Sequence, residues 1–113
     1  MAQIPVQIVR NGSVVSFKPT PQPVTSVDIL FWSNTDEQQA HQPAPVDSTG
    51  KITNAAAWMP KPIPAKLKDQ DAPSSRGLTF DPPPTSGTPY NVSYACALHP
   101  TVTSEKGVIT VKS

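Results

Sequence analysis

Three features that mark large classes of protein are nearly missing from this sequence. Cys96 is the only cysteine, so the chain cannot form an internal disulfide. No apolar run approaches the roughly 18 residues that a membrane-spanning helix needs. Nine lysines and arginines stand against eight aspartates and glutamates, which gives a net charge of +1. These absences argue against a disulfide-stabilised scaffold, a membrane protein, and a nucleic-acid-binding protein that needs a strong positive field.

The chain nonetheless has the composition of a folded domain. Its 113 residues are enough for one domain and too few for two. Hydrophobic residues make up 36% and charged residues 15%, which does not suit a charge-driven disordered chain. Residues Met1 to Pro5 lead straight into patterned sequence and do not resemble a signal peptide, although a mature form with an added Met1 would look the same. We expect a single domain over residues 1–113.

Proline is in clear excess. The 15 prolines run from Pro5 to Pro100 and far exceed the ~5% of an average protein. Proline breaks the interior of a helix, but it is accepted at strand ends, at sheet edges and in turns. A fold of strands and ordered loops is therefore favoured over one with long helices.

Alternating apolar residues predict several short strands. Residues 4–8 have the period of a half-buried strand, and Asn11-Gly12 is a strong signal for a tight turn into a second strand. Residues 27–32 are apolar on both faces, which predicts a central strand. Further strands are predicted over residues 15–17, 77–80, 90–97 and 108–111. The pattern predicts an all-β sandwich of about seven strands.

Residues 43–73 form a long, irregular and proline-rich segment, whose main helix candidate is residues 52–59. A stretch of this length without regular structure is usually functional or flexible. We expect a functional surface loop with few core contacts, whose shortening should leave the chemistry of the rest of the chain nearly intact but alter docking or stability.

Few residues can carry chemistry, because the chain has two histidines and one cysteine. His41, Cys96 and His99 all fall beside predicted strand ends, so one end of a sandwich can bring them together. Two imidazoles and a thiolate are the donor set of a trigonal copper site. The same groups hold zinc when a fourth ligand is present.

Each of these residues also has a simpler interpretation. A lone cysteine is commonly a small buried hydrophobe. His41 lies in a glutamine-rich loop that suits a solvated histidine, and His99 precedes a proline in a second loop. Nucleophilic catalysis by a Cys-His pair is disfavoured, because no orienting aspartate or asparagine is evident beside it. The conjunction of all three residues at strand ends favours a metal site.

Two parts of the sequence resemble a known family. The segment Tyr94-Ala95-Cys96-Ala97-Leu98-His99-Pro100, which leads to a closing strand from Gly107 to Val111, resembles the ligand loop of the cupredoxins. These are small blue copper proteins of the plastocyanin and amicyanin type. Upstream, Phe31-Trp32-Ser33-Asn34-Thr35-Asp36 followed by His41 is similar to the region around the family's first histidine ligand. The resemblance implies a cupredoxin-like Greek-key β-sandwich, with residues 43–73 as an unmatched insertion.

The resemblance also implies one mononuclear copper ion, held by His41, Cys96 and His99. At the position of the family's axial methionine this chain has Val102. A non-coordinating valine leaves a three-coordinate centre of high potential, and we favour this arrangement because valine occupies the matching position.

Two other arrangements fit the axial position. Glu105 can reach the metal through a lengthened loop and lower the potential, or the backbone carbonyl of Ala40 can supply a weak axial contact.

In function, the resemblance implies transfer of single electrons between redox partners and no enzymatic activity. His99, beside Leu98 and Pro100, would be the electron port near which a redox protein docks through a small interface. The resemblance further implies a monomer located in the periplasm or outside the cell. Two alternatives stay open: a copper carrier or storage protein without electron transfer, and a metal-free interaction domain that uses the long proline-rich segment.

Overall fold

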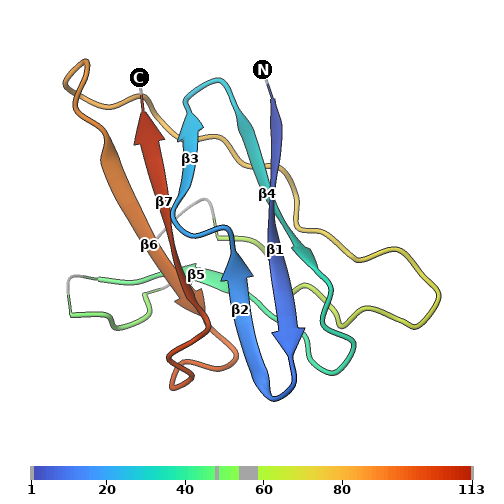
Figure 1. The fold of residues 1–113 in the computed structure, drawn as a ribbon. Helices are drawn as coiled ribbons and strands as arrows, with labels where there is room; N and C mark the ends of the chain where they lie inside the picture. The colour runs from blue at the N-terminus through green and yellow to red at the C-terminus, as the bar shows by residue number, and fades with distance from the viewer. Residues whose placement is uncertain (1, 48, 54–58, 113) are drawn as a thin grey trace.

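A computed structural model describes residues 2–47, 49–53 and 59–112 of the chain. These residues form seven strands and no helix. The described part of the chain therefore contains no helix that could cross a membrane. The strands are β1 Gln3–Asn11, β2 Val14–Lys18, β3 Gln22–Thr25, β4 Ile29–Asn34, β5 Pro43–Pro45, β6 Tyr90–Cys96 and β7 Lys106–Lys112. They make two mixed sheets in the orders β2-β1-β4 and β3-β7-β6-β5 (Figure 1). The predicted all-β sandwich is confirmed.

The first hairpin follows directly from the sequence. Asn11 pairs with Val14, so only two residues connect β1 to β2. One of them, Gly12, has a φ of 66°, which glycine adopts without steric cost. The alternation along β1 places Val6 and Ile8 in the core, as the period of two predicts.

The core lies between the two sheets and is centred on three aromatic rings. Trp32 of β4 and Tyr94 of β6 meet edge to face with ring centroids 5.2 Å apart, and Phe17 of β2 meets the same tyrosine at 5.0 Å. Edge-to-face pairs of this kind stabilise a core beyond their buried area. Since β4 and β6 belong to different sheets, these contacts fix how the sheets face each other at the strands that lead to the predicted ligands.

Tyr94 needs a glycine opposite it on β7. Gly107 is its partner in the antiparallel register, and a Cβ atom at Gly107 would overlap the Tyr94 ring and its hydroxyl. We therefore expect Gly107→Ala to lower the free energy of unfolding by about 1–3 kcal/mol, the usual cost of overpacking a core. Urea unfolding measures this loss. The matched control is Lys106→Ala at the exposed neighbouring position, and equal stabilities for the two variants would contradict the proposed overlap.

Strand β4 is not central, contrary to the prediction from its sequence. It lies at one end of the β2-β1-β4 order, and its burial alternates, with Leu30 and Trp32 in the core and Phe31 half-buried. Its outer edge is covered by the backbone of residues 73–78. Leu30 and Leu78 exchange both backbone hydrogen bonds at 2.8 Å. The outer edge of β4 is therefore occupied by this covering chain and not by another of the seven strands.

The prolines fall where their missing N–H groups cost little. Strands β3 and β5 are the two ends of the four-stranded sheet, and they contain Pro23, Pro43 and Pro45. Val46 N donates to Ser93 O, and Gln42 O accepts from Ala97 N. The backbone N–H and C=O groups of even-numbered residues in and beside β5 therefore point toward β6 and the residue that follows it. The two prolines of β5 therefore turn their nitrogens to the outer edge, as expected for proline in a sheet.

The sequence predicted that residues 43–73 are a surface loop with few core contacts, and this prediction is wrong. They contain β5, which pairs with the end of β6 at Cys96. They also contain Ile63, which is 2% exposed and exchanges backbone hydrogen bonds of 2.8 and 3.0 Å with His41. One part of the segment thus holds the strand that ends at Cys96, and another part holds the backbone of His41. Most of the predicted helix at 52–59 lies outside the described residues.

Candidate metal centre

The residues predicted to bind copper meet at one end of the sandwich. This end is opposite the start of β1 and the finish of β7 (Figure 1). Cys96 is the last residue of β6, and His41 lies between β4 and β5. His99 and Glu105 belong to the loop that connects β6 to β7. The structure therefore brings together all three residues that the sequence singled out.

The loop from β6 to β7 folds back on itself through backbone hydrogen bonds, most of which join residues three positions apart. His99 N donates to Cys96 O at 3.3 Å, Val102 N to His99 O at 3.1 Å, and Glu105 N to Val102 O at 3.2 Å. Finally, Cys96 N donates to Glu105 O at 3.1 Å and closes the loop. These consecutive turns return Glu105 to the side of Cys96 although nine positions separate them in the chain.

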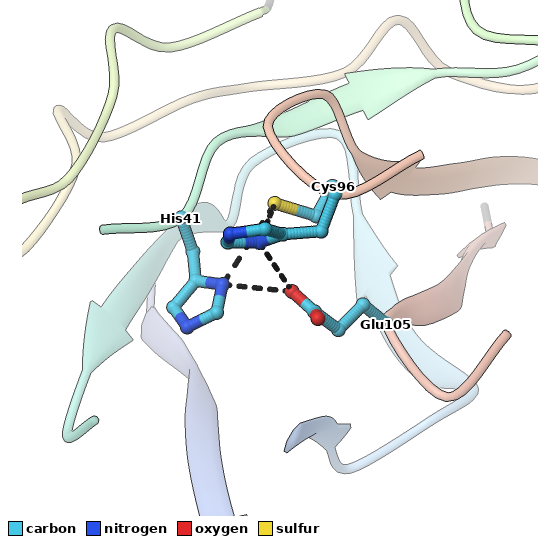
Figure 2. Close-up of side chains that lie close together, drawn as sticks. His41, Cys96 and Glu105 are labelled. Atoms are coloured by element: carbon cyan, nitrogen blue, oxygen red, sulfur yellow. Dashed lines mark hydrogen bonds and ion pairs between the residues drawn. The ribbon is translucent and has the colours of Figure 1, made fainter. Parts of the chain in front are cut away.

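Four donor atoms converge at this end, one each from His41, Cys96, His99 and Glu105, and all lie within 4.8 Å of one another. Cys96 Sγ is 3.7 Å from His41 Nδ1 and 3.4 Å from His99 Nδ1. Glu105 Oε1 is 2.8 Å from His41 Nδ1 and 3.1 Å from His99 Nδ1. Figure 2 shows His41, Cys96 and Glu105 pointing toward a common centre.

The cluster is closed to solvent except at one histidine. His41 and Cys96 are fully buried and Glu105 is 2% exposed, whereas the His99 side chain is 21% exposed. Burial raises the pKa of the Cys96 thiol, although N–H groups including that of Gln42, 3.5 Å from Sγ, oppose the shift. A metal ion that replaces the thiol proton removes this penalty, because the thiolate is the form that binds metals.

Glu105, the weaker axial candidate from the sequence, lies in the cluster of donor atoms. The sequence favoured an axial position occupied by Val102 with no donor atom. In the structure Val102 is 38% exposed, and the buried carboxylate of Glu105 stands beside both imidazoles. The sequence signal for Glu105 as a donor was its position directly before the last strand, in a loop that is longer than the ligand loop of the family. No pattern in the sequence gives the chain reversal that carries it inward.

Asp36 orients the ring of His41 by contacting Nε2, the ring nitrogen that faces away from the cluster. His41 Nε2 lies 2.7 Å from Asp36 Oδ2, and both side chains are fully buried. Burial opposes ionisation of Asp36, but hydrogen bonds from Arg10 and His41 outweigh it and hold the pKa of this carboxyl well below its usual range. With a carboxylate oxygen at Nε2, the other ring nitrogen, Nδ1, is the atom that faces the cluster.

This arrangement fits a metal ion. His41 Nδ1 and Glu105 Oε1 lie 2.8 Å apart, so a proton or a metal cation has to lie between the two atoms. Two imidazoles, a thiolate and a carboxylate are a donor set that copper accepts, and zinc accepts it as well. The chemistry of the side chains therefore agrees with a mononuclear site of four donors.

Comparison with known proteins identifies the fold. Neither a protein-family model nor a curated protein matches the sequence. Among solved structures, a purple cupredoxin from Nitrosopumilus maritimus is similar, with a TM-score of 0.65, 18% identity, and coverage of 96% of this chain and 99% of that one. A reduced Cu(I) form of amicyanin is similar with a TM-score of 0.63, 19% identity, and coverage of 97% and 82%. The chain thus has the cupredoxin fold, as the sequence predicted.

Proposed function

We propose that this chain is a mononuclear copper protein of the type 1 class, which transfers single electrons between redox partners. The observation that carries the proposal is the convergence of the only cysteine and both histidines at a buried end of a cupredoxin fold, where the sulfur lies 3.7 and 3.4 Å from the two Nδ1 atoms. Bound copper would supply one-electron exchange between Cu(I) and Cu(II). In this proposal residues 1–113 form one domain that holds one copper ion and has no enzymatic activity.

The ligands that we propose are His41, Cys96 and His99, with Glu105 as the fourth donor. The backbone on both sides of the cluster restrains them. Cys96 is fixed at the end of β6 by pairing with β5, and His41 is fixed by its backbone hydrogen bonds to Ile63. A cage that keeps its shape lets the charge of the metal change with little rearrangement.

His99 is the proposed port for electrons, because it is the one member of the cluster with substantial exposure. Leu98 and Val102, in the same loop, are 43% and 38% exposed and add apolar surface to it. Apolar surface of limited extent suits the small and transient interfaces of redox proteins. A redox protein that docks over His99 is therefore the proposed partner, met by a monomer in the periplasm or outside the cell.

A copper titration tests the proposal. Addition of one equivalent of Cu(II) is expected to produce an intense visible band, since a thiolate bound to Cu(II) gives a charge-transfer transition. Ascorbate should bleach the band, and ferricyanide should restore it. A protein that binds copper tightly without such cycling would be a carrier instead, and a protein that takes up no copper would be an interaction domain.

Zinc is the competing metal, because a buried carboxylate completes a set of four donors. Competition between the two metals for the metal-free protein tests whether the site accepts copper in preference to zinc. Copper should displace zinc, since Cu(II) binds more tightly than Zn(II) to a given set of nitrogen, oxygen and sulfur donors.

A further inference from the structure

Asp36 is a buried charge that the ligand set does not explain. Its side chain is fully buried, and it contacts His41 at Nε2, on the side of the ring away from the donor cluster. A buried carboxylate is costly unless its oxygens are paired and hydrogen-bonded. Its presence behind a proposed ligand therefore needs a reason.

Both carboxylate oxygens of Asp36 are fully engaged. Oδ1 accepts from Arg10 Nε at 2.7 Å and from the backbone N–H of Gln38 at 2.9 Å. Oδ2 accepts from Arg10 Nη2 at 3.0 Å and faces His41 Nε2 at 2.7 Å. The guanidinium thus grips the carboxylate with two parallel bonds, an arrangement that fixes direction as well as charge.

The loop that contains Asp36 is also fixed. Asn34 is fully buried, its Oδ1 accepts from Asp36 N at 2.9 Å, and its Nδ2 donates to Gln39 O at 3.1 Å and Pro64 O at 3.0 Å. Arg10 is held in turn by Gln39 Oε1 at 2.9 Å. Every element around the carboxylate therefore opposes its rotation away from His41.

We propose that Asp36, held by Arg10, is a positioning residue that keeps the hydrogen of His41 on Nε2 and makes this imidazole a stronger donor to Cu(II) than to Cu(I). The inference rests on the proposed copper site. An anionic acceptor on the far nitrogen of a metal-binding histidine fixes its tautomer and raises its basicity. Greater basicity favours the metal state of higher charge. The reduction potential is therefore lowered by a residue that does not touch the metal.

The test compares the unaltered protein with Asp36→Asn. Asparagine keeps the size and an acceptor oxygen but removes the charge. The affinity for Cu(II) should fall 10- to 100-fold, the usual effect of losing such a partner, while the affinity for Cu(I) changes less. The potential should then rise by about 59 mV for each tenfold difference between the two affinities. Voltammetry and competition with chelators measure these quantities.

Two further variants complete the design. Asp28→Asn is the matched control, because Asp28 is a carboxylate bonded to backbone N–H groups near the start of β4, away from the cluster. It removes the same charge and should leave the potential unchanged. The double variant Arg10→Gln, Asp36→Asn removes both charges and replaces the single variant if an unpaired Arg10 prevents folding.

A measurement without metal tests the positioning directly. In the metal-free protein, ¹⁵N NMR of the imidazole should show the His41 hydrogen on Nε2, and this preference should weaken in Asp36→Asn but not in Asp28→Asn. An unchanged potential and an unchanged NMR signature in Asp36→Asn would overturn the inference while the copper site stands. A missing thiolate-copper band in the unaltered protein would overturn the proposed function, and the inference with it.

Discussion

Cys96→Ser is expected to abolish the intense visible absorption of the copper-loaded protein. Cys96 is the only thiol in the chain, and a hydroxyl does not give the low-energy charge transfer of a thiolate to Cu(II). The loss should be complete to within the weak absorption of ordinary Cu(II) complexes. A spectrum recorded after one equivalent of Cu(II) measures it. His41→Ala and His99→Ala should weaken copper retention while the sandwich stays folded.

The control for these variants is Leu98→Ala, in the same loop and 43% exposed. It should keep the band, and circular dichroism should show the same β-sheet content in all four variants. A Cys96→Ser protein with undiminished absorption would refute the ligand assignment, since no other sulfur ligand of this kind exists in the sequence.

Glu105→Gln is expected to raise the reduction potential and shift the visible band. The carboxylate of Glu105 is buried at 2.8 and 3.1 Å from the two Nδ1 atoms, and an anionic oxygen favours Cu(II) over Cu(I). Loss of a direct ligand should weaken Cu(II) binding by tenfold or more, and each tenfold difference between the two states corresponds to about 59 mV. Voltammetry and the optical spectrum report the two changes.

Val102→Met is the matched comparison for Glu105→Gln. If Val102 occupied an empty axial position, as the sequence favoured, methionine there would supply an axial contact and lower the potential, and loss of Glu105 would change little. Because Val102 is 38% exposed, the structure leads us to expect a nearly unchanged potential in Val102→Met. A fall in the potential of Val102→Met, with no change in Glu105→Gln, would support the three-coordinate site instead.

The sequence predicted correctly those features of the fold that depend on a few adjacent residues. The Asn11-Gly12 turn, the alternation of Val6 and Ile8, and the cysteine at the end of a strand each depend on a few adjacent residues. These features were predicted because the period of a strand and the φ of a turn are set over short distances. Their order along the chain predicted an all-β sandwich, and the resemblance of residues 94–100 to the cupredoxin ligand loop implied the cupredoxin-like fold.

The remaining features depend on contacts between distant parts of the chain. Arg10 and Asp36 are 26 residues apart and meet only because β1 and β4 pair in parallel. Glu105 reaches the cluster only after consecutive turns that have no pattern in the sequence. Ile63 lies in a segment whose irregular composition indicated a loop, yet it pairs with His41. A single sequence does not encode such long-range pairs in any local signal.

The prolines at the sheet edges bear on how this molecule behaves in a crowded solution. An exposed strand edge with free N–H groups recruits a strand from another molecule, and the resulting adhesion is lasting. Pro43 and Pro45 present no N–H at the outer edge of β5, and the outer edge of β4 is already paired with residues 73–78. We therefore expect these two edges not to recruit a strand from another molecule. A protein that exchanges electrons with redox partners, as proposed above, would benefit when such encounters do not end in aggregation.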